Sequence, residues 1–150
     1  LNILANLPIQ LPKNVILTPH PKEASRLLNC SIDEILENME NSAKKISDKY
    51  KCITVLKSHK TIVFSQETIY HNTTGNSALA KAGSGDVLAG IIAGLLAQKM
   101  NIFEAAVLGV YLHGLAGDLA KEYLSAYGVL ASDTIRYIPL AIKNLLTSNI

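Results

Sequence analysis

The chain has 150 residues, of which 49% are apolar and 17% are charged, and its formal net charge is +2. This composition is typical of a folded globular protein and excludes an intrinsically disordered chain. The small net charge, with basic residues scattered or confined to one solvated helix face near residues 44–51, argues against a nucleic-acid partner.

The cysteines and the apolar runs bear on cellular location. Cys30 and Cys52 lie in separate predicted elements and form no CxxC pair, which favours free thiols in a reducing compartment. The most apolar run, residues 87–97, is too short to cross a bilayer, and no signal-peptide pattern opens the chain. These features predict a cytoplasmic protein without a membrane partner.

Strands and helices alternate in the first half of the chain. The run NVILTPHP predicts a buried strand that leaves its sheet at Thr18, because prolines follow at once. A helix should then start at residue 21 and end near residue 29. Ser31 and Glu34 form a capping box for a second, longer helix that should end near residue 50. The segments CITVLKS, TIVFSQ and TIYHNT predict a strand that continues into a small antiparallel extension.

Helices dominate the second half. Three are predicted after Gly75, at residues 85–100, 102–124 and 132–146. Strands followed by helices predict an α/β or α+β layer fold, although the strands are few for so many helices. The opening LNILANLP has an apolar helical pattern without a cap, as if the chain were cut within an element, and no linker or repeat marks a second domain.

A run of small residues, AKAGSGDVLAG at positions 80–90, carries the chemistry. Gly83, Ser84 and Gly85 would let a phosphate approach the free N–H groups of a helix N-terminus. Asp86 would then be the base that accepts the proton of an attacking hydroxyl. The alternative is purely structural: Ser84 caps the helix and Asp86 complements its dipole. The run is not a Walker loop, because no GxxxxGK[ST] pattern occurs.

Four segments carry a family resemblance, in the order VILTPHPKEASRLL, VLKSHKTIV, NTTGNSALAKAGSGDVLAGIIAGLLAQ and EAAVLGVYLHGLAGDLA. Together they resemble the ADP- or ATP-dependent NAD(P)H-hydrate dehydratases, a branch of the ribokinase-like superfamily, over nearly the whole chain. The opening LN is similar to the end of the family's Asp-Ala-Asp-Ala-Leu-Asn segment. The resemblance implies a ribokinase-like three-layer α/β fold. Residues 1–150 would form the C-terminal part of a single domain, a partial sheet flanked by helices, with the N-terminal part absent.

The resemblance also implies an activity. Members of the family repair NADHX and NADPHX, the hydrated forms of the reduced nicotinamide cofactors, and use ADP or ATP with Mg²⁺ to drive the loss of water. In this chain Asp86 would deprotonate the hydroxyl of the hydrate, and residues 83–85 would form the anion hole for the transferred phosphoryl group. The resemblance implies no protein side chain that binds the metal ion directly. The implied partners are these small molecules, the absent N-terminal part of the domain, and a fused or separate epimerase.

Further site residues are carried over from the family motifs. His20 matches a histidine that contacts the hydrate together with Asp86. The nucleotide would be bound by Gly85 and by the segment Lys57, Ser58, His59, Lys60 and Thr61. The site would be shaped by Thr74, Gly75 and Asn76.

This chain departs from the family motifs at several positions. Ser58 and Ala82 replace glycines, and Thr73 replaces a frequent proline. Lys81 replaces a threonine, and it would either add positive charge near the phosphate or face solvent.

The segment HGLAGD is interpreted as packing. His113 and Asp118 are five residues apart, which puts them off one helix face, so we interpret both as packing and interface residues, with the glycines allowing close helix contact. The 102–124 helix is apolar on more than one side, as Val107, Val110 and Leu115 illustrate. This pattern predicts burial against a second subunit or the absent strands, and hence a homo-oligomer.

Two alternative functions remain open. The first is a small-molecule kinase of the same superfamily, acting on a vitamin precursor or a sugar, with the same base and anion hole but a stable phosphorylated product. The second is a non-catalytic nucleotide-binding subunit that keeps the fold without turnover.

Overall fold

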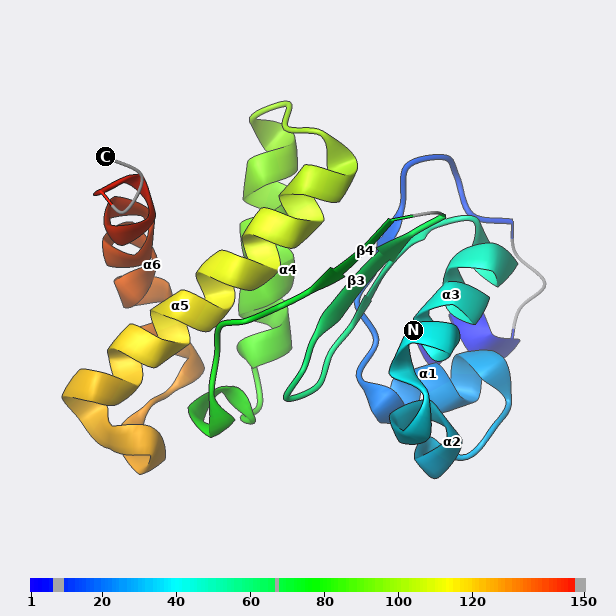
Figure 1. The fold of residues 1–150 in the computed structure, drawn as a ribbon, viewed down its shortest axis with the longest axis horizontal. Coiled ribbons are helices and arrows are strands. Elements are labelled where there is room, and N and C mark those ends of the chain that lie inside the picture. The colour runs from blue at the N-terminus through cyan, green and yellow to red at the C-terminus, as the bar shows by residue number, and fades with distance from the viewer. Residues whose placement is uncertain (7–9, 67, 148–150) are drawn as a thin grey trace. The chain divides into compact units, whose positions relative to one another are not determined.

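The computed structural model describes residues 1–6, 10–66 and 68–147. The chain forms two compact units, Leu1–Asn72 and Thr73–Ile150. The first contains a small sheet with its helices, and the second is helical (Figure 1).

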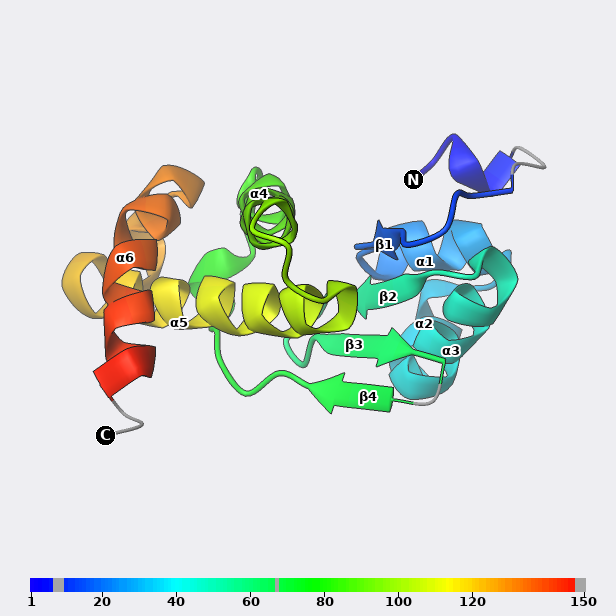
Figure 2. The ribbon, with the colours of Figure 1, turned by 90° about the horizontal axis from the view of Figure 1, so that it is seen from above.

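One four-stranded sheet organises the first unit. Its strands are β1 (Ile16–Leu17), β2 (Ile53–Leu56), β3 (Ile62–Ser65) and β4 (Thr68–His71). They lie in the order β1-β2-β3-β4, which Figure 2 shows from above. β1 pairs with β2 in parallel, whereas β2, β3 and β4 pair antiparallel, with Val63 opposite both Val55 and Tyr70. The predicted strand and its antiparallel extension are confirmed.

The helices of the first unit begin at local capping signals. They are α1 (Pro21–Leu28), α2 (Ile32–Glu37) and α3 (Met39–Tyr50), after a short 3₁₀ turn, η1 (Leu4–Asn6). The predicted capping box is present, because Ser31 Oγ accepts from the N–H of Glu34 at 3.1 Å and Glu34 Oε1 accepts from the N–H of Ser31 at 2.9 Å. Hydrogen bonds from the Ser31 backbone and side chain hold the pKa of the Glu34 carboxyl below its usual value.

The single long helix predicted to end near residue 50 is wrong. Two helices stand in its place, because Asn38 leaves the helical conformation with φ −142° and ψ 71°. Its side-chain oxygen accepts a hydrogen bond from the N–H of Asn41 at 3.1 Å and so starts α3. Asparagine competes well for such N-cap positions, and this local bond explains the break.

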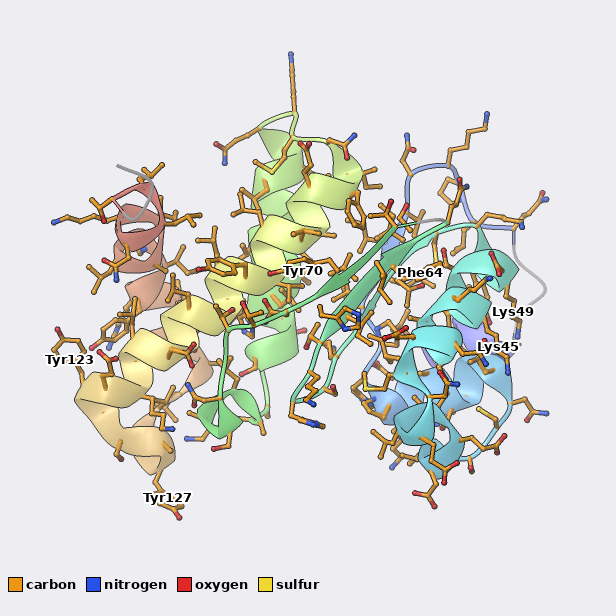
Figure 3. All side chains as sticks on the ribbon, in the orientation of Figure 1. Lys45, Lys49, Phe64, Tyr70, Tyr123 and Tyr127 are labelled. Carbon is orange, nitrogen blue, oxygen red and sulfur yellow. The ribbon has the colours of Figure 1, made fainter. Side chains whose placement is uncertain are left out.

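The core of the first unit lies between its helices and the sheet. α3 packs on β2 and β3. Large buried side chains come from every layer, among them Leu27, Ile35, Ile46, Leu56 and Phe64, of which Phe64 is labelled in Figure 3. Cys52 belongs to this cluster, where burial raises the pKa of its thiol, and both cysteines are free, as predicted. Of the opening segment LNILANLP, Leu1 and Leu4 pack on this core, while residues 7 and 8 lie outside the described residues.

Three helices and one short turn form the second unit. They are η2 (Ser77–Leu79), α4 (Ser84–Ala97), α5 (Ile102–Gly128) and α6 (Ala131–Thr147), which confirms the three predicted helices (Figure 1). Asn101 caps α5, since its Oδ1 accepts from the N–H of Phe103 at 2.9 Å. α5 runs past the predicted end at residue 124 and is kinked at Ser125, whose φ is 62°.

α5 is the central helix of the second unit, and η2, α4 and α6 all pack against it. Small residues permit the contact: a Cβ added at Gly109 would lie 2.5 Å from Ile92 Cγ1 of α4. Val110 is buried, and Val107 and Leu115 are half-buried. Among the described helices, α5 alone is long and apolar enough to span a membrane by length and composition. Packing within the unit accounts for that composition, since ten of its residues are buried.

Candidate active site

The turn before α4 pairs only part of its backbone N–H groups, among them that of Ser84, which donates to the carbonyl of Lys81 at 3.3 Å. Gly83 is the N-cap residue, with φ 88° and ψ −19°, a left-handed conformation that favours glycine. No side chain caps the helix, and within residues 1–6, 10–66 and 68–147 the N–H of Gly85 has no acceptor. Ser84 is buried and does not cap α4. The structural interpretation of Ser84 is therefore wrong, and the N-terminus of α4 is open to an anion.

Asp86 lies in the first turn of α4, next to this open N-terminus. Its side chain is exposed and makes no hydrogen bond or ion pair with any residue that the structure describes. Its backbone N–H donates to the carbonyl of Gly83 at 3.1 Å, which fixes the residue to the turn. Because the carboxylate is not used as a cap, it is available to a ligand bound at the turn.

The loop at residues 74–76 is held to α5 by an acid that sequence reasoning assigned to packing. Asp118 accepts from the N–H of Gly75 through Oδ2 at 2.8 Å and from Nδ2 of Asn76 through Oδ1 at 2.7 Å. Thr74 adds a third bond, from its Oγ1 to the carbonyl of Tyr111 at 2.8 Å. The signal that pointed to this role was the pair of glycines beside the acid in HGLAGD, because they leave room for a loop on that face.

The contact between the loop and α5 is close enough to exclude side chains. A Cβ added at Gly114 would lie 2.6 Å from the carbonyl carbon of Thr74, and one added at Gly117 would lie 2.7 Å from the side chain of Leu79. Gly75 itself has φ 102°. The glycines of this segment do allow close contact, as predicted, but the partners at Gly114 and Gly117 are the loop and η2.

Replacing Gly114 with alanine should destabilise the second unit. The new methyl group would have to displace the backbone of Thr74, and overpacking of this kind costs about 3 kcal/mol. Urea unfolding of the intact protein would measure the loss. Gly90 in α4 is the matched control, because a Cβ there meets nothing within 4 Å, so Gly90→Ala should stabilise the helix by about 1 kcal/mol. Equal effects of the two substitutions would contradict the close contact.

In the first unit, His20 caps a helix. Its Nδ1 accepts from the N–H of Glu23 at 3.3 Å, and its own N–H donates to Glu23 Oε2 at 2.9 Å, which completes a capping box at the start of α1. The imidazole Nε2 lies 3.5 Å from Glu23 Oε2, and the side chain is 48% exposed. Sequence reasoning assigned His20 to ligand binding and missed the cap. Half of the ring surface still faces outward.

The segment from Lys57 to Thr61 lies beside the TPHP segment. The N–H of Lys57 donates to the carbonyl of Pro19 at 2.8 Å. Both segments follow parallel strands, β1 and β2, whose carboxyl ends share the sheet edge where α/β folds bind ligands. Ser58 builds the turn, since its Oγ accepts from the N–H of Lys60 at 2.9 Å and its carbonyl accepts from Thr61 Oγ1 at 3.0 Å. Ser58 is not among the residues with positive φ, so this turn does not need a glycine's freedom there.

The structure thus brings the predicted residues together in two groups. His20 and residues 57–61 share one sheet edge in the first unit. Residues 74–76 and 83–86 belong to the second unit, on either side of η2. The sequence pattern of the NAD(P)H-hydrate dehydratases matches residues 1–140. The chain belongs to this family.

Individual relatives agree with the family assignment. The chain is 50% identical over 123 residues to the ADP-dependent (S)-NAD(P)H-hydrate dehydratase of Neisseria meningitidis, a match that covers 81% of this chain and 42% of that protein. It is 40% identical over 134 residues to the bifunctional NAD(P)H-hydrate repair enzyme Nnr of Escherichia coli, covering 89% of this chain and 26% of that protein. The chain therefore spans less than half the length of these dehydratase relatives.

Solved structures of the family share the fold. The ADP/ATP-dependent NAD(P)H-hydrate dehydratase of Bacillus subtilis, co-crystallised with ATP and Mg²⁺, aligns with a TM-score of 0.86 and 34% identity over 91% of this chain and 52% of that one. A ribokinase-like superfamily protein from Enterococcus faecalis aligns with a TM-score of 0.77 and 34% identity over 93% of this chain and 47% of that one. The predicted ribokinase-like α/β fold is confirmed.

Proposed function

We propose that this chain forms part of an enzyme that dehydrates NADHX and NADPHX to the reduced cofactors at the expense of ADP or ATP. The observation that carries the proposal is the N-terminus of α4, in a chain of this family. It combines an uncapped helix start, a left-handed Gly83 and the exposed carboxylate of Asp86. Helix N-termini of this form bind transferring phosphoryl groups, and a carboxylate at the same place can accept a proton.

The reaction proceeds in two stages. Asp86 removes the proton of the hydrate's hydroxyl, and the oxygen attacks the terminal phosphorus of the nucleotide, whose bond to the leaving phosphate oxygen breaks. The N–H groups at Gly83–Gly85 stabilise the charge on the transferring group. The lone pair of the ring nitrogen then expels phosphate, and loss of a proton from the neighbouring ring carbon restores the double bond of the reduced nicotinamide. Hydrate and ADP become NAD(P)H, AMP and phosphate, or ADP and phosphate when ATP is the donor.

The other predicted residues take binding roles in this proposal. His20 contacts the hydrate with the exposed part of its ring, while its Nδ1 continues to cap α1. Residues 57–61 lie along the adenylate, and the turn built by Ser58 supports that role. Thr74, Gly75 and Asn76 shape the site, since Asp118 holds them against α5.

Mg²⁺ enters this reaction with the nucleotide. Nowhere in the part of the chain that the structure describes do three His, Cys, Asp or Glu side chains gather as a metal site. In this proposal the ion is carried on phosphate oxygens, the usual mode for Mg²⁺ at nucleotide sites. Bound there, it neutralises phosphate charge.

We extend the proposal to the assembly. Residues 1–150 are the C-terminal part of a single dehydratase domain, and the N-terminal part completes it; the 42% and 52% coverage of relatives supports this arrangement. Similarity to bifunctional repair enzymes supports a fused or separate epimerase as partner. Val107 and Leu115 are only half-buried, and the apolar surface that they leave exposed supports a homo-oligomer. The two free cysteines support a cytoplasmic location. The mass of the intact protein, measured under native and denaturing conditions, tests both its length and its oligomeric state.

The decisive experiment follows both products of the reaction. The intact protein is incubated with NADHX or NADPHX, Mg²⁺ and either ADP or ATP, while the absorbance of the reduced nicotinamide and the free phosphate are recorded. We expect the two signals to rise together in equal amounts. A stable phosphorylated product without free phosphate would instead show a kinase of the same fold. Nucleotide binding without any product would show a non-catalytic subunit.

A further inference from the structure

Lys81 lies just before the turn at Gly83, and its side chain binds backbone carbonyls. Its Nζ donates to the carbonyl of Tyr127 at 3.0 Å and also to the carbonyl of Val129. Its backbone belongs to the turn, because its N–H donates to the carbonyl of Leu79 at 2.8 Å and its carbonyl accepts from the N–H of Ser84 at 3.3 Å. The ammonium is therefore held by these two carbonyls and does not extend freely into solvent.

One acceptor of this ammonium, the carbonyl of Tyr127, lies in the last turn of α5, and the other belongs to Val129, the residue after the helix end. They carry partial negative charge, because a helix C-terminus leaves its final carbonyls without intrahelical donors, and a lysine there is favoured. The side chain of Tyr127 is 97% exposed and points away from the helices (Figure 3), so the contact uses its carbonyl and not its ring. Val129 is buried with Ala78 and Ala120, which gives the ammonium a fixed anchor.

A second contact joins the turn before α4 to the segment that follows α5. A Cβ added at Gly83 would lie 3.2 Å from the Cβ of Ala131, the first residue of α6. Residues 127–131, which run from the end of α5 to the start of α6, thus meet the turn at two points, through the ammonium of Lys81 and through Ala131.

We infer that Lys81 is a positioning residue: by binding the carbonyls of Tyr127 and Val129, it holds the turn at residues 83–85 in register with the end of α5. The consequence for catalysis rests on the proposed function of that turn. Misplacement of a charge-stabilising group by about 1 Å lowers the rate on the order of a hundredfold. Loss of the contact between Lys81 and these carbonyls should therefore lower the catalytic rate.

The first test removes the charge and keeps the length. In the intact protein, Lys81→Met should lower kcat by about ten- to a hundredfold, with the KM of the nucleotide changing much less. Hydrogen exchange without substrate should speed up at the amides of Ser84, Asp86 and Val87, which bond within the turn. Lys121→Met is the matched control, an exposed lysine on α5 that should change neither quantity. Unchanged exchange in Lys81→Met would overturn the inference.

The second test restores the ammonium from solution. Lys81→Ala should regain part of its kcat, and the slow exchange of the three amides, when propylammonium is added. Tetramethylammonium at equal concentration should not help, because it carries the charge but no N–H donors. Equal recovery with both cations, or none with either, would overturn the tether. If the wild-type protein shows no dehydratase activity, the proposed function is overturned instead. The hydrogen-exchange data would still test whether Lys81 holds the turn.

Discussion

Asp86→Asn is expected to abolish dehydration, lowering the rate by about a thousandfold or more. The amide keeps the shape of the side chain but cannot accept the proton of the attacking hydroxyl. Nucleotide affinity should stay within a few fold of wild type, because the N–H groups of the turn remain in place. Single-turnover phosphate release and calorimetric titration with ADP, both on the intact protein with Mg²⁺, measure the two quantities.

A control separates base catalysis from the helix dipole. Glu104 is an exposed acid in the first turn of α5, as Asp86 is in the first turn of α4. Glu104→Gln removes a comparable charge from a helix N-terminus and should leave turnover unchanged. A near-normal rate in Asp86→Asn, or an equal loss in both variants, would refute the assignment of Asp86 as the base.

Gly85→Ala is expected to lower the dehydration rate by on the order of a hundredfold while the protein stays folded, the scale seen when an anion-hole donor is lost. Gly85 is the second residue of α4 and is not among the glycines with positive φ, so alanine fits its backbone. The loss should arise because the methyl group blocks the approach of the phosphoryl group to the open N–H groups.

Stability and activity should therefore separate at Gly85. Thermal unfolding and phosphate release are measured on the same preparation, with nucleotide and Mg²⁺ present. Gly83→Ala is the contrasting variant, because its φ of 88° and the nearby Ala131 make alanine strained there, so both properties should fall together. If the rate in Gly85→Ala falls only as far as stability does, the glycines serve the fold and the anion hole is refuted.

Features that depend on neighbours in the chain could be predicted from the sequence. The two members of the capping box, Ser31 and Glu34, are three positions apart, and the β-branched runs that became β2, β3 and β4 follow one another closely in the chain. The three helices of the second unit follow from periodicity and from Asn101 as a cap. Asn38 shows the limit of this reasoning, since its cap ended one helix and began another where the apolar pattern continued.

The supports of the candidate site could not be predicted in this way, because their partners are far apart in the chain. Asp118 binds Gly75 and Asn76 across 43 and 42 positions, and the Nζ of Lys81 binds a carbonyl 46 positions away. A backbone carbonyl carries no signature in a sequence, and a carboxylate on a helix looks the same whether it meets solvent or a loop. The sequence by itself determined which residues form the turn and supply its acid. Only the tertiary structure decided what holds them, because packing on α5 brings those partners into hydrogen-bonding distance.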